Sequence, residues 1–317
     1  MTNGRMIFIF LDGVGIGKPS PSNPFFVSNS EYLPLYTGNP GWPDRTPVKP
    51  IDPLFGIKGL PQSATGQTTL YTGQIIPRLL NKHQGTYPNK LMRKIIKQYN
   101  ILALLKKNRF RVSFINAYPV FAPFFTSNHV NIHHDGQIRF SKQFPEFYKK
   151  RISVTSCMMI LSQQKPFDEK DVESEKSIFQ DYSNLTLKER GLHLPEFSPE
   201  KAAEIIFNKS REFDFILYEY FQTDIFGHRK PIRECINLVE NLNRLIRTLV
   251  ASLDKKTDTL LITSDHGNLE DCSIRTHTLN PVPLILWGNN LEKMRNQINT
   301  IADISPAILD YFTFNPD

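Results

Sequence analysis

The amino-acid sequence predicts an α/β fold built on a doubly wound, mostly parallel sheet. Short apolar runs typical of buried strands alternate along the chain with longer segments of helical periodicity, and this alternation is typical of such sheets. Three of the apolar runs lead into acidic residues, at the strand ends where open α/β sheets bind their ligands. With 317 residues, 40% of them hydrophobic, the chain is long enough for one large domain that carries an insertion.

The clearest strand is the apolar run at 6–11, which is continuous and ends at Asp12-Gly13. Continuous runs of this kind are typical of strands that are buried on both faces in a parallel sheet. We predict further strands at 111–116, 214–220, 259–264 and 282–287.

Helices are predicted between these strands. Residues 90–107 and 231–253 have apolar positions at helical spacing, and a short helix is expected near 66–72. Another helix begins at Ser198-Pro199, because Ser is a good N-cap and Pro suits the first helical position. A last helix at 301–312 closes the fold.

Two segments do not follow the alternating pattern. Residues 18–62 are rich in Pro, Gly, Asn and Ser, so we expect a long ordered loop. Residues 119–197 are rich in Phe, Ser, Gln and Lys and have weak periodicity. We predict that this second segment is a small inserted cap, and that 1–118 and 198–317 together form a metal-binding catalytic core.

Charge and cysteine content limit the classes of partner. The formal charge of +7 suits small anionic molecules, and no dense Lys/Arg tract indicates nucleic acid. The three cysteines are far apart without a CxxC pair, which argues for a reducing compartment. The apolar run at 6–11 is too short to span a membrane and lacks a cleavage site. We therefore expect a cytoplasmic protein without a membrane partner, and the sequence leaves the oligomeric state open.

Acidic and histidine side chains follow the predicted strands and should meet at one edge of the sheet. They are Asp12, Asp224, His228, Asp265, His266 and His277. Three carboxylates at close range repel one another, and bound cations relieve that repulsion. Oxygen and imidazole ligands without thiolate suit Zn²⁺ or Mn²⁺. Asp224 and His228 also have i, i+4 spacing, which places both side chains on one helical face.

Ser63 is the candidate nucleophile. It lies at the expected start of a helix, where backbone N–H groups and the positive end of the helix dipole favour an anion. A metal ion would lower the pKa of its hydroxyl further. For a serine taken alone, a helix cap would be the favoured interpretation, and Thr65, Thr68 and Thr69 are competing hydroxyls.

Taken in order, these residues resemble the metalloenzyme core of cofactor-independent phosphoglycerate mutase and phosphopentomutase, in the alkaline phosphatase superfamily. The motifs that carry the resemblance are Leu11-Asp12-Gly13, Ser63-x-x-Gly66, Asp224-x-x-Gly227-His228, Asp265-His266-Gly267-Asn268 and Thr276-His277-Thr278 with Asn280-Pro281-Val282-Pro283. The resemblance implies that one metal is held by Asp224, His228 and His277. It implies that a second metal is held by Asp12, Asp265, His266 and the oxygen of Ser63, which also has the family's ten-residue offset to Gly73.

The chain departs from the mutase pattern in two places. Gln67 stands where the mutase has a histidine, and the insertion is short and comes later in the chain. The His133-His134-Asp135-Gly136 sequence is interpreted as a surface turn rather than a sugar-acid motif. A short cap excludes water less well, which favours hydrolysis over return of the phosphate to the substrate.

We therefore expect two-metal phosphoryl transfer on a small anionic phosphate monoester through phospho-Ser63, ending in hydrolysis. The alternatives are a phosphomutase, a phosphodiesterase, and a catalytically silent binding module. A sulfatase is disfavoured, because residues 63–67 lack the Pro and Arg that direct formylglycine formation. The cap cations that could meet the substrate are Arg139, Lys142, Lys149, Lys150 and Arg151.

Overall fold

The central strand of the protein is β1 (Arg5–Leu11). In the computed structural model, which describes residues 4–313, it runs parallel to β6 (Phe215–Tyr220) on one side and β7 (Asp258–Thr263) on the other. Its side chains alternate between two hydrophobic clusters, one containing Met6, Phe8 and Phe10 and the other Ile7, Ile9 and Leu11. Because successive strand residues point to opposite faces, a continuous apolar strand implies a sheet covered on both sides.

The sheet has six strands in the order β2-β8-β7-β1-β6-β3, with β2 (Val48–Ile51), β3 (Val112–Phe114) and β8 (Val282–Trp287) completing the set. The four strands from β7 to β3 are parallel, while β8 is antiparallel to β7 and β2 is antiparallel to β8. This confirms the predicted α/β class. Strand β2 was not predicted, since it lies in the Pro-rich loop and itself contains Pro50. Edge strands tolerate proline because one side of the backbone is unpaired.

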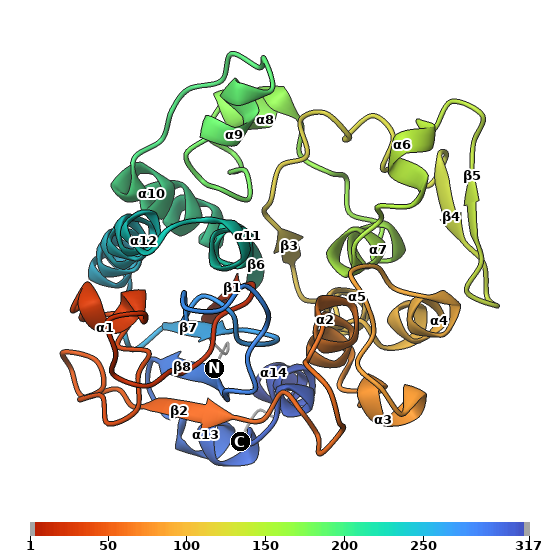
Figure 1. The fold of residues 1–317 in the computed structure, drawn as a ribbon. Coiled ribbons are helices and arrows are strands. Elements are labelled where there is room, and N and C mark those ends of the chain that lie inside the picture. Colours follow the sequence, from red (N-terminus) through yellow and green to blue (C-terminus); the bar gives the residue numbers. More distant parts are fainter. Residues whose placement is uncertain (1–3, 314–317) are drawn as a thin grey trace.

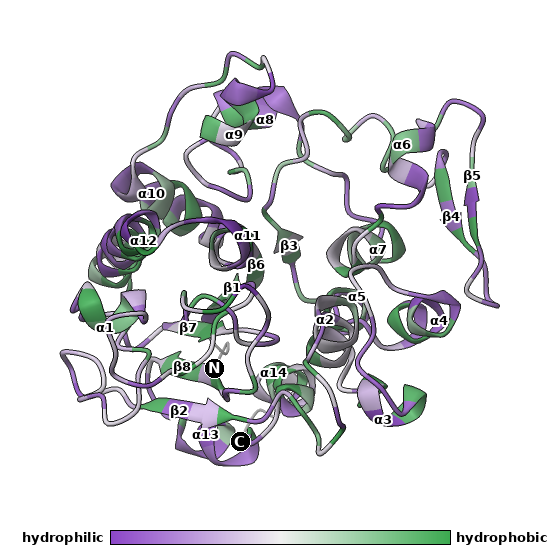
Figure 2. Ribbon diagram, viewed as in Figure 1, coloured by the Kyte–Doolittle hydropathy of each residue, from purple (hydrophilic) through white to green (hydrophobic). Residues whose placement is uncertain are grey.

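Helices cover both faces of this sheet (Figure 1). One face carries α2 (Ser63–Thr72), α4 (Lys90–Tyr99), α5 (Ile101–Lys107), α7 (Val154–Leu161) and α14 (Ile304–Thr313). The other face carries α1 (Pro24–Val27), α10 (Pro199–Ser210) and α12 (Ile232–Ser252). Figure 2 shows hydrophobic and hydrophilic residues alternating around α4, α10 and α12, as expected of helices that pack one side on a sheet.

Two helix boundaries show how local chemistry sets the elements. Helix α10 begins where predicted, with the side chain of Ser198 accepting a hydrogen bond from the N–H of Lys201 at 3.1 Å. The single helix predicted at 90–107 was wrong, because Asn100 divides it. The Asn100 side chain donates to Ile96 O at 2.9 Å and accepts from Ala103 N at 2.9 Å, so it ends α4 and caps α5.

The segment predicted as a cap contains the hairpin β4 (Val130–Ile132) and β5 (Ile138–Phe140) with the helices α6 (Glu146–Lys149), α7, α8 (Glu169–Glu173) and α9 (Leu185–Glu189). The His133–Gly136 stretch is the turn of this hairpin, as expected. Helix α7 is almost wholly buried and packs on α4, α2 and α5. The segment thus supplies part of the hydrophobic core, and its division from the rest as a cap stays a prediction.

The remaining helices are α3 (Ile76–Leu80), α11 (Gln222–Arg229), α13 (Glu292–Gln297) and the 3-10 turn η1 (Ile301–Asp303). Within residues 4–313, none of the helices combines the length and the apolar character needed to cross a bilayer.

Candidate metal centre and active site

The six residues predicted as metal ligands converge at one edge of the sheet. Asp12 directly follows β1, and Asp265 and His266 follow β7. Asp224 and His228 lie one turn apart on α11, which starts two residues after β6. His277 lies in the loop that leads into β8. The convergence follows from the parallel strands, whose carboxyl ends meet at the same edge.

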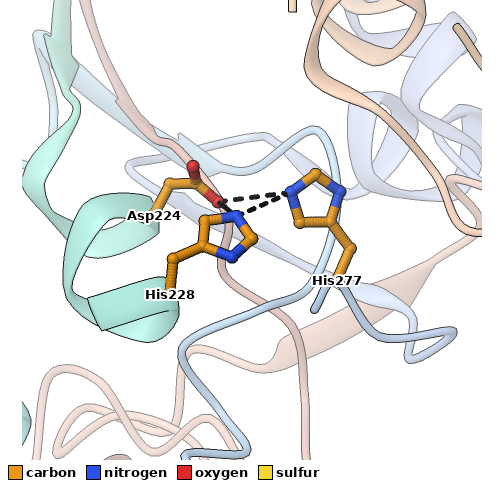
Figure 3. Close-up of side chains that lie close together, drawn as sticks. All are labelled: Asp224, His228 and His277. Carbon is orange, nitrogen blue, oxygen red and sulfur yellow. Dashed lines mark hydrogen bonds and ion pairs between the residues drawn. The ribbon is translucent and has the colours of Figure 1, made fainter. Parts of the chain in front are cut away.

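Asp224, His228 and His277 form the first cluster (Figure 3). The Nε2 atoms of the two histidines lie 3.1 Å apart, and Asp224 Oδ1 lies 3.4 Å from His228 Nε2 and 3.6 Å from His277 Nε2. The three ligand atoms therefore face one another around a single point, which is the arrangement that a shared cation requires.

The ring tautomers support a cation at that point. His228 Nδ1 lies 2.9 Å from Arg275 O, and His277 Nδ1 lies 2.6 Å from Pro61 O. A carbonyl oxygen can only accept a hydrogen bond, so each Nδ1 carries the proton and the Nε2 of each neutral ring has a free lone pair. Burial lowers the pKa of His277 to about 4, which keeps that ring neutral. Two facing lone pairs need either a metal ion or a proton on His228, whose pKa the Asp224 carboxylate raises.

The second cluster contains Asp12, Asp265, His266 and Ser63. His266 Nε2 lies 3.6 Å from Asp12 Oδ1, 3.6 Å from Asp265 Oδ2 and 3.1 Å from Ser63 Oγ. Both of those carboxylate oxygens are buried without a hydrogen-bond partner. Burial, together with the neighbouring carboxylates, raises the pKa of Asp12 well above its usual range and that of Asp265 to about 7.

These orphaned oxygens show that the residues fit a metal site. An unpaired buried carboxylate oxygen is costly, and a divalent cation would satisfy both oxygens at once. The two clusters are adjacent, because the rings of His266 and His277 stack at 3.8 Å and Asp224 also lies within reach of Asp12 and His266. Asp224 thus lies between the clusters, although the family resemblance assigned it to the first alone.

Ser63 is the first residue of α2 and lies directly beside the second cluster. The competing hydroxyls are committed elsewhere: Thr65, Thr68 and Thr69 are buried and donate to backbone carbonyls one turn earlier in the chain, at 2.6–3.0 Å. Ser63 is only partly buried and is open to the cavity. Among these four hydroxyls, it is therefore the one that can reach a substrate.

Sequence reasoning missed two buried glutamates. Glu270 accepts hydrogen bonds from Gly15 N at 2.8 Å, Asn268 N at 2.8 Å and Asn280 Nδ2 at 3.0 Å, and also from Thr278 Oγ1. It joins the loops that follow β1 and β7 to the loop that carries His277. The only sequence signal for Glu270 was its position close after Asp265-His266. Without further context, such a residue is interpreted as an ordinary solvated charge.

The other missed residue is Glu219, the only acid in the apolar run of β6. Thr155 Oγ1 donates to Glu219 Oε2 at 2.9 Å, and burial raises the pKa of Glu219 to about 7. An acid inside an apolar strand was a usable signal, because a buried carboxyl group needs a specific partner. That partner lies in α7, 64 residues away in the sequence.

The first cluster and Ser63 of the second line a cavity of about 980 Å³. It lies between the two halves of the predicted cap, since Phe147, Tyr148 and Arg151 line one side and Gln180 and Arg190 line another. Figure 1 shows the corresponding helices α6 and α9 on either side of β3. Of the five cap cations expected to meet a substrate, Arg151 lines this cavity and the other four do not. The further cations in its wall, Arg190, Arg229 and Arg275, were not predicted.

The comparisons with known proteins agree with this geometry. Residues 188–316 match the model of the Metalloenzyme superfamily. This superfamily segment contains Asp224, His228, Asp265, His266 and His277.

The sequence relatives of this chain include 2,3-bisphosphoglycerate-independent phosphoglycerate mutases. The Mycoplasma genitalium enzyme is 30% identical over 127 residues, which is 38% of this chain and 25% of the mutase. The Pyropia yezoensis enzyme is 34% identical over 138 residues, or 36% of this chain and 25% of the mutase. The match therefore spans about a quarter of the length of these relatives.

The structural neighbours have the alkaline phosphatase-like fold over the whole chain. Alkaline phosphatase from the Antarctic bacterium TAB5 superposes with a TM-score of 0.57 at 12% identity and covers 99% of both chains. The lipoteichoic acid synthase LtaP from Listeria monocytogenes superposes with a TM-score of 0.50 at 9% identity, covering 99% of this chain and 73% of LtaP. The predicted fold and the resemblance to this superfamily are thus confirmed, and metal dependence is a property of its phosphatases and mutases.

Proposed function

We propose that this protein is a phosphohydrolase that uses two divalent metal ions, Mn²⁺ or Zn²⁺, to cleave a small anionic phosphate monoester through phospho-Ser63. The observation that carries the proposal is Ser63 Oγ at the start of α2, 3.1 Å from His266 and beside two unpartnered carboxylate oxygens. A hydroxyl in that position has an anion-stabilising helix end and a cation site on the same side.

In the proposed reaction, the oxygen of Ser63 forms a bond to phosphorus while the bond between phosphorus and the alcohol oxygen breaks. The hydroxyl of Ser63 loses one proton in this step, and the departing alcohol gains one, so the number of protons is unchanged. A water molecule then attacks the phosphoserine, which releases inorganic phosphate and restores the hydroxyl of Ser63. The bound metal ions would supply positive charge for the phosphoryl oxygens and lower the pKa of the hydroxyl.

Several side chains of the chain would hold this arrangement in place. His228 and His277 are fixed by hydrogen bonds from Nδ1 to backbone carbonyls. Asn268 Nδ2 donates to Asp224 Oδ1 at 2.7 Å. Partners of this kind orient metal ligands and are important for their affinity.

A phosphomutase is the second candidate, and the sequence identity to phosphoglycerate mutases favours it. Hydrolysis is preferred because the cavity is open to solvent on the side of Phe147, which is 61% exposed. A mutase must hold its dephosphorylated intermediate away from water.

The test is a screen of phosphorylated metabolites with the full chain and either Mn²⁺ or Zn²⁺, scored for released phosphate and for isomerised product. We expect free phosphate in stoichiometric amount with the alcohol product. Isomerised product with little free phosphate would support the mutase. Faster turnover of a diester than of the matching monoester would support a phosphodiesterase, and metal binding without turnover would support a silent binding module.

A further inference from the structure

A ladder of aromatic side chains forms one wall of the catalytic cavity. The ring centroids of Phe125 and Phe121 lie 5.8 Å apart, those of Phe121 and Tyr148 lie 4.0 Å apart, and those of Tyr148 and Phe147 lie 4.9 Å apart. Each pair meets edge to face, and all four residues line the same cavity as Ser63. We call these four residues the aromatic wall.

The wall is anchored at one end and open at the other. Phe125 is 4% exposed and packs on buried Phe144 at 5.8 Å, so the inner end belongs to the hydrophobic core. Phe147, at the outer end, is 61% exposed, the highest value among the large hydrophobic residues described. The guanidinium of Arg151 lies 3.7 Å from the centre of the Phe147 ring. The outer end of the wall is therefore accessible to a ligand that enters the cavity.

The chemistry of the lining indicates what that ligand is. The cavity is lined by seven aromatic residues, Tyr87, Tyr118, Phe121, Phe125, Phe147, Tyr148 and Phe221, against only two aliphatic ones, Leu60 and Ile225. Aromatic rings pair best with other flat rings, edge to face or offset-stacked, whereas an alkyl chain gains from any apolar wall. A volume of about 980 Å³ is also at the upper end for small-molecule sites, so it leaves room beyond a phosphoryl group.

We propose that the natural substrate is a phosphate monoester whose alcohol part carries a flat aromatic ring, such as a nucleobase or an aryl group, and that the aromatic wall selects it through Phe147 and Tyr148. This inference rests on the proposed function for the reaction at the phosphate end. It adds the chemical class of the leaving group. Arg151 lies against the Phe147 ring and Arg190 lines another side of the same cavity, so both would tolerate further anionic substituents on the ring.

The first experiment measures binding without turnover. Calorimetry of the Mn²⁺-loaded full chain compares benzylphosphonate with cyclohexylmethylphosphonate, which have the same carbon skeleton but differ in ring flatness. We expect benzylphosphonate to bind roughly five- to tenfold tighter, the range typical of one aromatic pair. Equal affinities, or tighter binding of heptylphosphonate, would overturn the proposal.

The second experiment measures kcat/KM for adenosine 5′-monophosphate and ribose 5-phosphate. Both release a primary alcohol, so their intrinsic reactivity is similar and the base is the main difference. We expect a preference for the nucleotide of about tenfold or more, as stacking of one base provides. If neither compound releases phosphate, the proposed hydrolysis fails, while the phosphonate affinities still decide the ring site.

Substitutions at Phe147 test whether the aromatic wall causes the preference for a flat ring. Phe147→Leu keeps apolar volume but removes the ring, and should lower both ratios at least twofold while Tyr148 supplies the remaining preference, whereas Phe147→Tyr should preserve them. The residue is exposed, so neither change threatens folding. Phe26→Leu is the matched control, since Phe26 is 41% exposed but does not line the cavity. Unchanged ratios in Phe147→Leu would exclude Phe147 as the selecting residue and overturn the proposal.

Discussion

The two sides of the cavity differ in burial and bonding. On the sheet edge, Asp12, Asp265 and His266 are fully buried, and backbone and loop hydrogen bonds leave them little freedom. On the opposite side, Phe147 and Arg190 are exposed and come from helices of four and five residues or the loops beside them. The clustered acids and histidines thus lie on a buried edge of the sheet, whereas the opposite wall is built from short elements that can vary at little cost in stability.

The largest expected effect on turnover comes from substitution of the candidate nucleophile, beside the buried edge of the sheet. Ser63→Ala should lower turnover by about 10³-fold or more, because the nucleophile is lost. Metal content should stay near wild type, since the other six ligands remain. Mass spectrometry of enzyme trapped with substrate should find phosphate on the peptide containing Ser63.

The control for this prediction is Thr65→Val, which removes the nearest competing hydroxyl. It should retain activity and lose only the stability that comes from the hydrogen bond to Gln62 O. Phosphate on Thr65, or full activity in Ser63→Ala, would contradict the assignment.

Removal of single carboxylates should weaken metal binding. Asp224→Asn and Asp265→Asn should each lower activity by about 10²-fold or more and reduce bound metal, measured by elemental analysis. A chelator should inactivate the wild type, and Mn²⁺ or Zn²⁺ should restore it. Asp271→Asn, a nearby acid outside the clusters, serves as control. An active protein with less than one metal ion per chain would refute this interpretation.

The stability of the metal-free protein should fall as pH rises from about 6.5 to 8.5. Burial raises the pKa of Asp265 and of Glu219 to about 7, so the folded state binds protons that the unfolded state has already lost. Stability from such groups is fully present below the unfolded pKa of about 4 and falls until the pH exceeds the folded pKa. The last part of this loss, between pH 6.5 and 8.5, is about 1 kcal/mol for each group. Buried His277, with its pKa lowered to about 4, has the opposite effect, but only below about pH 6.5.

This prediction is measured by thermal unfolding in chelator across the pH range. Glu219→Gln should flatten the decline, because one of the titrating carboxyls is gone. Added Mn²⁺ or Zn²⁺ should raise the unfolding temperature most at pH 8.5, where the carboxylates are ionised. A metal-free protein that becomes more stable between pH 6.5 and 8.5 would contradict the assignment of buried protonated carboxyls.

The smallest expected effect on the kinetic constants comes from substitution of an exposed arginine in the cavity wall. Arg190→Gln should raise KM about two- to fivefold for an anionic substrate and leave kcat nearly unchanged, because an exposed cation attracts charge but is well screened. The difference from wild type should shrink at high salt. Lys142→Gln is the control, since Lys142 lies in the same segment but does not line the cavity. A large loss of kcat in Arg190→Gln would place that arginine in the reacting centre instead.

Deleting most of the predicted cap would damage the hydrophobic core. Removal of residues 125–195 would take out Phe144 and all of α7, including buried Cys157 and Met158. Excision of the β4–β5 hairpin alone avoids α7, and because no hairpin residue lines the cavity, metal content and selectivity should both be retained.

The amino-acid sequence was enough to predict the α/β class, the main strands of the sheet and the six residues that cluster at its edge. It could do so because each signal is local: a continuous apolar run, an acid at its end, or an Asp and a His one helical turn apart. Local pattern was not enough to choose Ser63 as the nucleophile, because four hydroxyl side chains lie within seven residues. Only the structure shows that the three threonines donate to their own backbone.

Tertiary structure alone decided the features that depend on contacts between distant residues. Glu270 has no distinctive pattern in the sequence, and Glu219 stands out only by its place in an apolar run. The partners of both residues lie on other loops and helices. Strand β2 forms because β8 pairs with it, despite Pro50. The aromatic wall arises where Phe121 and Phe125 meet Tyr148, more than 20 residues later in the chain. Local pattern cannot reveal such a surface, because the packing of separate segments creates it.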